Sequence, residues 1–157
     1  MSDYQELLAQ LQREEDTLQF DAFTNEIAFS LGTKLVQVAL QGGLSVTVDI
    51  CRSGQQLFHC ALTGTSADND AWIKRKNRVV NRFGHSSYHI GIKLKSQDAS
   101  LDSKYLLDPR KYAAHGGAFP VIVRNVGVIG TVTVSGLAQE DDHRLVVRVL
   151  KEYLAAD

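Results

Sequence analysis

The sequence AHGGAFPVIV (114–123), followed by GVIGTVTVSG (127–136), says most about how this chain folds. Pro120 opens an apolar run and a β-branched run follows it, which predicts two strands, near 120–124 and 127–135. The two glycines before the first strand free the backbone to take positive φ and to approach another group closely. A core does not need the histidine beside them, so this stretch also indicates where a ligand site is expected.

Helical periodicity and end signals predict the remaining elements. One helix is expected from Ser2 to about Asp16, and a stronger one from about Thr24 to Gln41, where two glycines stop it. Strand-forming runs on either side of Ser53-Gly54 predict a hairpin. Further helices are expected from a cap at Ser66 or Asp68 to Phe83, from His85 to about Lys95 and from about Glu140 to Ala155, with 97–112 as a polar surface excursion.

The order of these elements is helices, hairpin, helices, hairpin, helix. Hairpins pair antiparallel, and four strands alone leave a sheet face bare, so helices must cover the sheet. The sequence therefore predicts an α+β fold of the profilin-like type, an antiparallel β-sheet flanked by α-helices. With 157 residues the chain has the length of one domain with its own core, which we place at 1–157.

The charge and composition of the chain limit the kinds of partner that it is expected to bind. The formal net charge of −1 gives no field that would attract polyanions, so we expect no nucleic-acid partner. No run approaches 18 apolar residues and the first residues are polar and acidic, so we expect neither a membrane span nor a secretory signal, and a cytoplasmic location.

The hairpin also sets the state of the two cysteines. With a two-residue loop, paired positions sum to 107, which places Cys51 opposite Gln56 and Cys60 opposite Thr47. The thiols are then too far apart for a disulfide, so both are expected to be free.

His59 belongs to the same hairpin. Phe58 and its alternate neighbours form the more apolar set, so they should face the core, with His59 on the opposite face near Thr47 or Asp49. We expect a subunit interface to cover that face.

Several motifs together resemble a known family. The segments AHGGAFP (114–120), GVIG (127–130), TVSGL (133–137) and EDDH (140–143) resemble the haem-degrading domain family of HbpS-like and GlcG-like proteins. The segments FH (58–59), GTSADNDAW (64–72) and FGHSSY (83–88) resemble its stand-alone, uncharacterised UPF0303-like branch. This resemblance implies a profilin-like domain assembled into homo-oligomers, with haem or corrinoid-related ligands in some branches.

His115, Gly116 and Gly117 form the first candidate site. A neutral imidazole can ligate iron, and exposed glycine amides can bond an anionic group such as a propionate. The alternative is a positive-φ turn in which the histidine bonds backbone.

The loop that carries Thr65, Ser66 and Asn69 is the second candidate, because unpaired amides at a helix start suit an anion. Helix capping alone accounts for the same residues, and Asp68 and Asp70 already supply negative charge there.

His85 and Ser86 form the third candidate, and His89 lies one helical turn beyond His85, a spacing that can chelate a metal. No carboxylate follows at zinc-protease spacing, so we assign no metal ligand. The stripe of Lys74, Arg78 and Arg82 suits either the helix dipole or a carboxylate-bearing ligand or acidic partner.

The sequence thus predicts a homo-oligomeric module that binds a small anionic ligand, with haem or a related tetrapyrrole as the candidate cofactor. Its pocket is expected to bring together Thr65, Ser66, Asn69, His85, Ser86, His115, Gly116 and Gly117. The alternatives are a protein-interaction or assembly component without catalysis and an oxidative haem-degrading enzyme. No complete catalytic set is present, so no catalytic residue is assigned.

Overall fold

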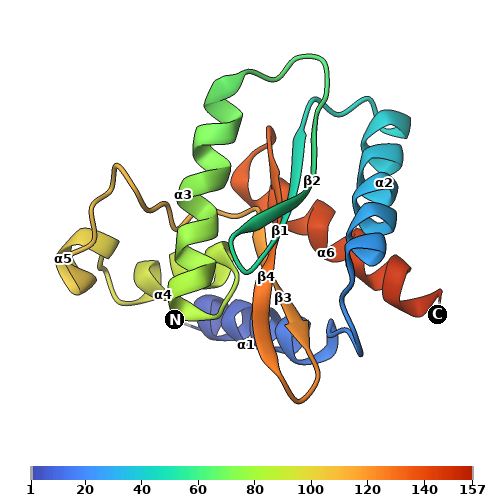
Figure 1. Cartoon of the computed structure of the whole chain (residues 1–157). Helices are drawn as coiled ribbons and strands as arrows, with labels where there is room; N and C mark the ends of the chain where they lie inside the picture. Colours follow the sequence, from blue (N-terminus) through green and yellow to red (C-terminus); the bar gives the residue numbers. More distant parts are fainter. Residues whose placement is uncertain (1, 157) are drawn as a thin grey trace.

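A computed structural model describes residues 2–156 of the chain. Its elements are α1 (Ser2–Thr17), α2 (Asn25–Gln41), β1 (Thr47–Arg52), β2 (Gln55–Ala61), α3 (Ala67–Phe83), α4 (Ser87–Ser96), α5 (Leu101–Tyr105), β3 (Ala118–Val123), β4 (Gly127–Ser135) and α6 (Gln139–Ala155). The strands form one antiparallel sheet in the order β2-β1-β4-β3 (Figure 1). The predicted α+β fold with a helix-flanked antiparallel sheet is confirmed.

Local signals at the helix ends explain where the long helices begin and stop. Thr24 caps α2 by accepting a hydrogen bond from the amide of Ile27, as expected from its side chain. α3 ends at Gly84, which takes the left-handed conformation at φ 72° that favours glycine. One element was missed: five residues of the expected polar excursion form α5, capped by Ser100. It is too short to show a helical period.

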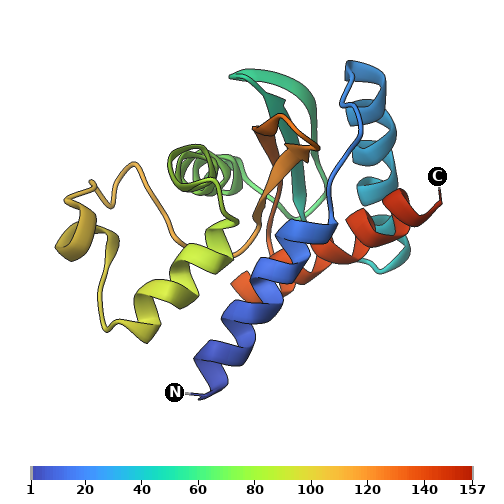
Figure 2. The ribbon, with the colours of Figure 1, turned by 90° about the horizontal axis from the view of Figure 1, so that it is seen from below.

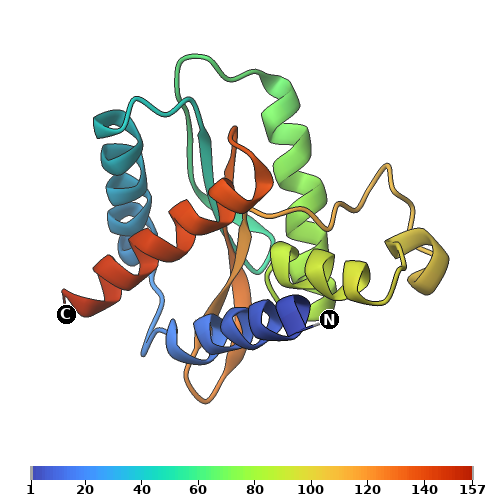
Figure 3. The same cartoon turned by 180° about the vertical axis from the view of Figure 1, so that it is seen from behind.

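The helices cover the two sheet faces unequally. α2 and α6 lie on one face and α3 on the other, as the view from below shows (Figure 2). Seen from behind, α6 crosses in front of the sheet, and α1 lies below α6 and beside α4 (Figure 3). After α1, the amide of Phe20 bonds the carbonyl of Ile122, so this segment adds one bridge to the edge of β3. The outer edge of β2 is the other end of the sheet.

The two sheet faces differ in chemistry. Toward α2 and α6 the strands present buried valines, isoleucine and phenylalanine, which form the main core with Leu31, Leu35 and Leu150. Toward α3 they present Thr47, Asp49, Cys51, Thr131, Thr133 and Ser135. All of these except the half-buried Cys51 are buried. Buried polar groups favour hydrogen-bonded partners, and α3 supplies them to Asp49, Thr133 and Ser135. The hydroxyls of Thr47 and Thr131 have no such partner among the described residues.

The hairpin register differs from the prediction by one residue over most of its length. Cys51 pairs with Gln56 as predicted, but an irregularity between Ile50 and Cys51 shifts the rest, so Cys60 faces Val48 and not Thr47. Both cysteines are free. No helix in the described part of the chain is both long and apolar enough to cross a membrane.

Candidate functional site

A polar cavity lies where the N-terminal half of α3 meets the start of α6. Its volume is about 390 Å³, within the range of small-molecule sites. We call it the α3–α6 cavity. It is lined by Asp68, Asn69, Trp72, Lys76, His115, Ser135, Gly136, Leu137, Gln139 and Asp142.

His115 stands at the cavity in contact with an aromatic side chain of α3. Its ring packs edge to face on Trp72, with 5.3 Å between the ring centroids. The Arg75 guanidinium covers the same indole at 4.6 Å. Burial, followed by the positive charges of Lys76 and Arg75, lowers the pKa of His115 below its usual 6.5. The imidazole is therefore neutral at pH 7.

A buried ion pair forms the floor of the cavity. Lys76 Nζ lies 3.3 Å from Asp142 Oδ2 and donates to the carbonyl of Val134 at 3.2 Å. Burial lowers the pKa of Lys76 and raises that of Asp142, and in each case the charge of the partner opposes the shift. Asp142 also accepts the amide of Leu137 at 2.9 Å, which ties the start of α6 to the end of β4.

The two glycines beside His115 are buried, so they do not present exposed amides as expected. The amide of Gly116 donates to Gln139 Oε1 at 3.0 Å, so it is already bonded. Gly117 has φ +136°, and a Cβ there would lie 2.7 Å from Lys76 Nζ. An added Cβ would also overlap the carbonyl oxygen of Val134, so this glycine leaves room for both that carbonyl and the buried lysine.

The loop residues divide between capping and the cavity. The hydroxyl of Thr65 donates to the carbonyl of Leu62, and Ser66 forms a capping box with Asn69. These bonds support the capping interpretation for Thr65 and Ser66, neither of which lines the cavity. Asn69 does line it, and its amide donates to Ser135 Oγ at 3.3 Å.

His85 and Ser86 do not line the α3–α6 cavity, so the expected convergence of all three segments on one cavity is wrong. They follow the C-terminal end of α3, whereas the α3 residues of the cavity belong to its N-terminal half. His85 Nδ1 lies 2.6 Å from Glu15 Oε1, and Ser86 caps α4 and donates its amide to Glu15 Oε2.

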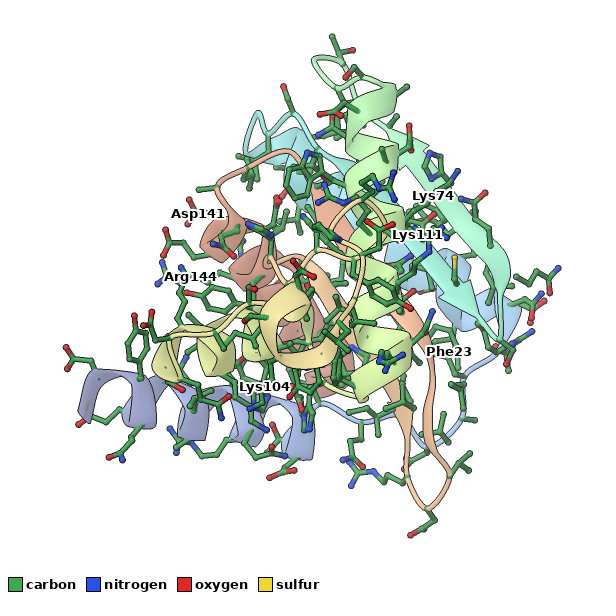
Figure 4. The ribbon with its side chains drawn as sticks, turned by 90° about the vertical axis from the view of Figure 1, so that its left-hand side faces the viewer. Phe23, Lys74, Lys104, Lys111, Asp141 and Arg144 are labelled. Atoms are coloured by element: carbon green, nitrogen blue, oxygen red, sulfur yellow. The ribbon has the colours of Figure 1, made fainter. Side chains whose placement is uncertain are left out.

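A second cavity lies along the same sheet face toward the C-terminal half of α3. It measures about 560 Å³, and we call it the β1–α3 cavity. Cys51, Thr131, Lys74, Asn77 and Arg78 are among its lining residues. Figure 4 shows Lys74 on α3 and Lys111 in the segment that crosses that helix. Arg78 donates to the carbonyl of Lys111 at 3.0 Å, so part of the predicted basic stripe holds this segment in place.

Between the two cavities, a hydrogen-bonded network surrounds Asp49. This buried carboxylate receives bonds from Gln56, Asn77 and the thiol of Cys51, and His59 Nδ1 lies 3.1 Å away. His59 is near Asp49 as predicted. Asp70 of α3 lies 3.1 Å from His59 Nε2 on the same face, and the His59 side chain is still 33% exposed. The subunit interface expected over this face stays a prediction.

The sequence analysis gave no site role to Asp49, Asn77 or Asp142, and it did not predict the burial of Lys76. One signal was available for the lysine: it falls on the apolar stripe of its helix, with Ile73 and Val80, which indicates burial. A second signal was the strict alternation of Val132 and Val134 with threonine and serine along β4. It indicates that this strand has one apolar face and one polar face.

The α3–α6 cavity is equipped for binding more than for covalent chemistry. Its one serine hydroxyl accepts from Asn69, and its lysine is held by Asp142. What remains available is a neutral imidazole, an indole face and polar groups at the rim.

The chain was compared with protein families, with curated proteins and with solved structures, and similar proteins were found in all three. Residues 23–151 match the family model described as "Haem degrading protein HbpS-like". A UPF0303 protein of Streptomyces coelicolor is 50% identical over 147 residues, covering 94% of this chain and 93% of its own. The crystal structure of Ybr137w protein superposes with a TM-score of 0.88 at 34% identity, covering 95% of this chain and 88% of that one. A structure titled as a PduOC:Heme complex has a TM-score of 0.68 at 18% identity, covering 83% and 94%.

Proposed function

Because the chain belongs to the HbpS-like family, among its uncharacterised UPF0303 proteins, we propose that it binds a small anionic ligand, haem or a related tetrapyrrole, in the α3–α6 cavity. Two features of the cavity support this: a histidine that can ligate iron, and an indole beside it that can pack against a flat macrocycle. The fold shared with PduOC, whose structure is titled as a heme complex, adds support.

The observation that carries the proposal is the state of His115. Four of the five histidines lie within hydrogen-bond distance of a carboxylate: His59 with Asp49, His85 and His89 with Glu15, and His143 with Glu14. His115 has no such contact in the described part of the chain, and its pKa is lowered. A neutral imidazole with a free lone pair is the form that binds iron.

Residues around His115 suit the rest of such a ligand. Trp72 supplies an apolar face, and Arg75 above it supplies a positive charge near the mouth. Lys76 offers a second positive charge, although Asp142 compensates it. In this proposal the iron is ligated by His115, and the carboxylates of the ligand meet the basic and amide side chains. When bound, haem supplies a redox-active iron centre.

Titration with haemin tests the proposal. We expect saturable binding at stoichiometric ratio with a shifted Soret band, and His115→Ala should weaken binding at least about tenfold and alter the band, since the residue that would ligate the iron is lost. His85→Ala is the matched control, because it removes a histidine at the far end of α3 and should bind haemin as the natural chain does. Absence of saturable binding, or an unchanged spectrum in His115→Ala, would contradict the proposal.

Arg78→Ala separates the two cavities. It removes a cation from the lining of the β1–α3 cavity and leaves the α3–α6 cavity intact. If this variant lost haemin binding and His115→Ala kept it, the ligand would bind in the β1–α3 cavity, and our proposal would be wrong.

We further infer that the module is a homo-oligomer. The supporting observation is an exposed apolar face on α2, where Phe29 is 65% and Leu40 62% exposed. In an assembly component without catalysis, this surface would be the functional one.

A further inference from the structure

Three potential metal ligands from two distant segments meet beside the start of α4. Glu15 comes from α1, His85 from the turn after α3, and His89 from the first turn of α4. His85 Nδ1 lies 2.6 Å from Glu15 Oε1, and His89 Nδ1 lies 2.8 Å from Glu15 Oε2. One ligand atom from each residue can be chosen so that all three lie within 4.8 Å of one another.

We propose that Glu15, His85 and His89 bind a divalent first-row transition metal ion, with Zn²⁺ as the reference case. Two imidazoles and one carboxylate are a ligand set that zinc accepts and that non-haem iron also uses. Hard cations such as Mg²⁺ prefer six oxygens, so this set discriminates against them.

The spacing of the ligand atoms suits a metal ion after a small adjustment. Zinc bonds to nitrogen and oxygen of about 2.0–2.2 Å, in tetrahedral geometry, separate neighbouring ligand atoms by roughly 3.4 Å. The present separations of 2.6 and 2.8 Å are those of hydrogen bonds. These two distances run to different oxygens of Glu15, and one ligand atom from each residue lies within 4.8 Å of the others. Metal binding would therefore widen the shorter separations and narrow the longer ones by roughly 1 Å, which side-chain rotation provides. Metal binding would then replace the protons that the imidazoles share with the carboxylate.

The supporting residues hold two of the ligands in place. The amide of Ser86 donates to Glu15 Oε2 at 3.0 Å, which orients the carboxylate. Ser86 also caps α4 by accepting the amide of His89 at 3.0 Å, which fixes the backbone that carries this histidine. Glu15 and His89 are 4% and 7% exposed, so both are fixed by packing.

The third ligand leaves an opening. The side chain of His85 is 37% exposed, so an ion can enter from solvent and keep a water molecule in the fourth position. Three protein ligands with one open position are the pattern of catalytic and regulatory zinc sites rather than of closed structural ones.

Helix α1 also carries a second carboxylate–histidine pair that can be compared with this site. Glu14, next in sequence, pairs with His143 of α6 at 2.8 Å, and both are buried. That pair joins one carboxylate to one imidazole and is not among the three-residue groups that could hold a metal. It shows what a carboxylate–histidine anchor of α1 looks like without a third ligand.

This site is separate from the proposed ligand cavity. It lies at the opposite end of α3, and Glu15 falls outside residues 23–151 that match the family model. A metal there would fasten α1 to α4. The two proposals can therefore fail independently.

Zn²⁺ binding to the full chain, stripped with a chelator and titrated against a chromophoric competitor, tests the proposal. We expect one Zn²⁺ per chain and a raised Tm, and Co²⁺ should give visible ligand-field bands of nitrogen and oxygen coordination. His85→Ala should weaken Zn²⁺ at least about tenfold and abolish the rise in Tm, because removing a ligand lowers affinity while sparing the two buried residues. Mg²⁺ should not compete.

The matched control is Glu14→Gln, which changes the neighbouring carboxylate and should bind Zn²⁺ as the natural chain does. His89→Ala and Glu15→Gln should lose binding as well, and circular dichroism checks that they fold. If these two variants do not fold, the Zn²⁺ affinity of His85→Ala alone tests the site. No stoichiometric Zn²⁺ in the natural chain, or equal affinity in His85→Ala, would overturn the site whatever haemin does.

Discussion

Among single residues, Gly117 is a position where both the backbone conformation and the surrounding atoms disfavour a side chain. Its φ of +136° disfavours any other residue, and an added Cβ would meet the carbonyl of Val134 and the ammonium of Lys76. Gly127 has a similar φ of +117° with open space around it. We predict that Gly127→Ala loses about 1–3 kcal/mol of unfolding free energy through backbone strain alone. Gly117→Ala should lose about 1–3 kcal/mol more through overlap.

Urea unfolding of the two alanine variants measures the difference. Equal losses would mean that the Lys76 side chain moves aside freely, and that the floor of the α3–α6 cavity is not tightly packed.

Cys51 is the second residue whose surroundings dictate its chemistry. Burial, the negative charge of Asp49 and the hydrogen bond between them raise the pKa of the Cys51 thiol to about 12. We predict that this thiol alkylates very slowly at pH 8, since the thiolate is the reactive form. Asp49→Asn removes the charge, and each unit by which the pKa falls multiplies the thiolate fraction by about ten.

Iodoacetamide labelling in a Cys60→Ser background isolates this thiol. We expect Asp49→Asn to react at least about tenfold faster, and Asp70→Asn, which touches His59 but not the thiol, to react like the parent. Equal rates in the parent and Asp49→Asn would show that the carboxylate does not control the thiol.

Local sequence identified some site residues and misplaced others for a physical reason. Asn69 and His115 were recognisable because each lies next to a structural boundary, a helix start or a strand start, and both line the same cavity. His85 also follows a helix end, but it is the opposite end of α3. Residue type and sequence spacing do not determine which end of α3 packs against the segment that carries His115. That depends on how the helices pack on the whole sheet.

At the level of elements, the Lys76–Asp142 pair joins α3 to α6 across the end of β4. Both side chains are at most 4% exposed. Removing one partner of a buried pair costs about 3–5 kcal/mol, because the remaining charge has no counter-ion. We predict a loss of this size for Lys76→Met at pH 7, and a smaller loss for Lys76→Met with Asp142→Asn than the two single losses combined.

The pH dependence of Lys76→Met follows from the carboxyl group that is left behind. Burial already raises the pKa of Asp142, and the variant loses the cation that opposes this shift. Protonation removes the unpaired charge, so the destabilisation should shrink as pH falls through this raised pKa and be largest at neutral pH and above. Unfolding at pH 5 and pH 8 checks the sign, and a deficit that grows toward pH 5 would contradict it.

The long helices and the strands were easier to predict than the strand register or the short helix α5. The long helices and all four strands carry clear periodicity, and Ser66, one of the two caps that the sequence offered for α3, is the residue that caps it. Cys60 was assigned the wrong partner because a bulge after Ile50 shifts the pairing, and no residue type marks that position. The cap of α5 at Ser100 lies in a polar stretch where serines serve turns equally well.

For the whole molecule, the contrast between the two sheet faces accounts for where chemistry can occur. The α2 and α6 face is closed by apolar packing, so it stabilises the fold. The α3 face buries threonines, Asp49 and a lysine, and both cavities described here open along it. Alternation within β1 and β4 predicts two unlike faces, but only the assembled sheet shows that a helix covers the polar one.

The molecule also has one apolar surface that its own chain does not cover. Phe29 and Leu40 lie 11 residues apart on α2, about three turns, so they share a face. Phe29 packs on Phe58 of β2, with ring centroids 6.3 Å apart, so this face continues to the edge strand of the sheet. We predict that copies of the chain associate through it, since exposed apolar helix faces beside an unpaired strand edge favour association.

Light scattering after size exclusion measures the assembly directly. We expect the natural chain to have a mass that is a multiple of 17.3 kDa, and Phe29→Glu with Leu40→Glu to run at 17.3 kDa, because two buried charges would oppose the contact. Leu106→Glu is the control, since this leucine is 86% exposed but lies at the end of α5, away from α2. A natural chain of 17.3 kDa, or a double variant that keeps the larger mass, would exclude α2 as the subunit contact.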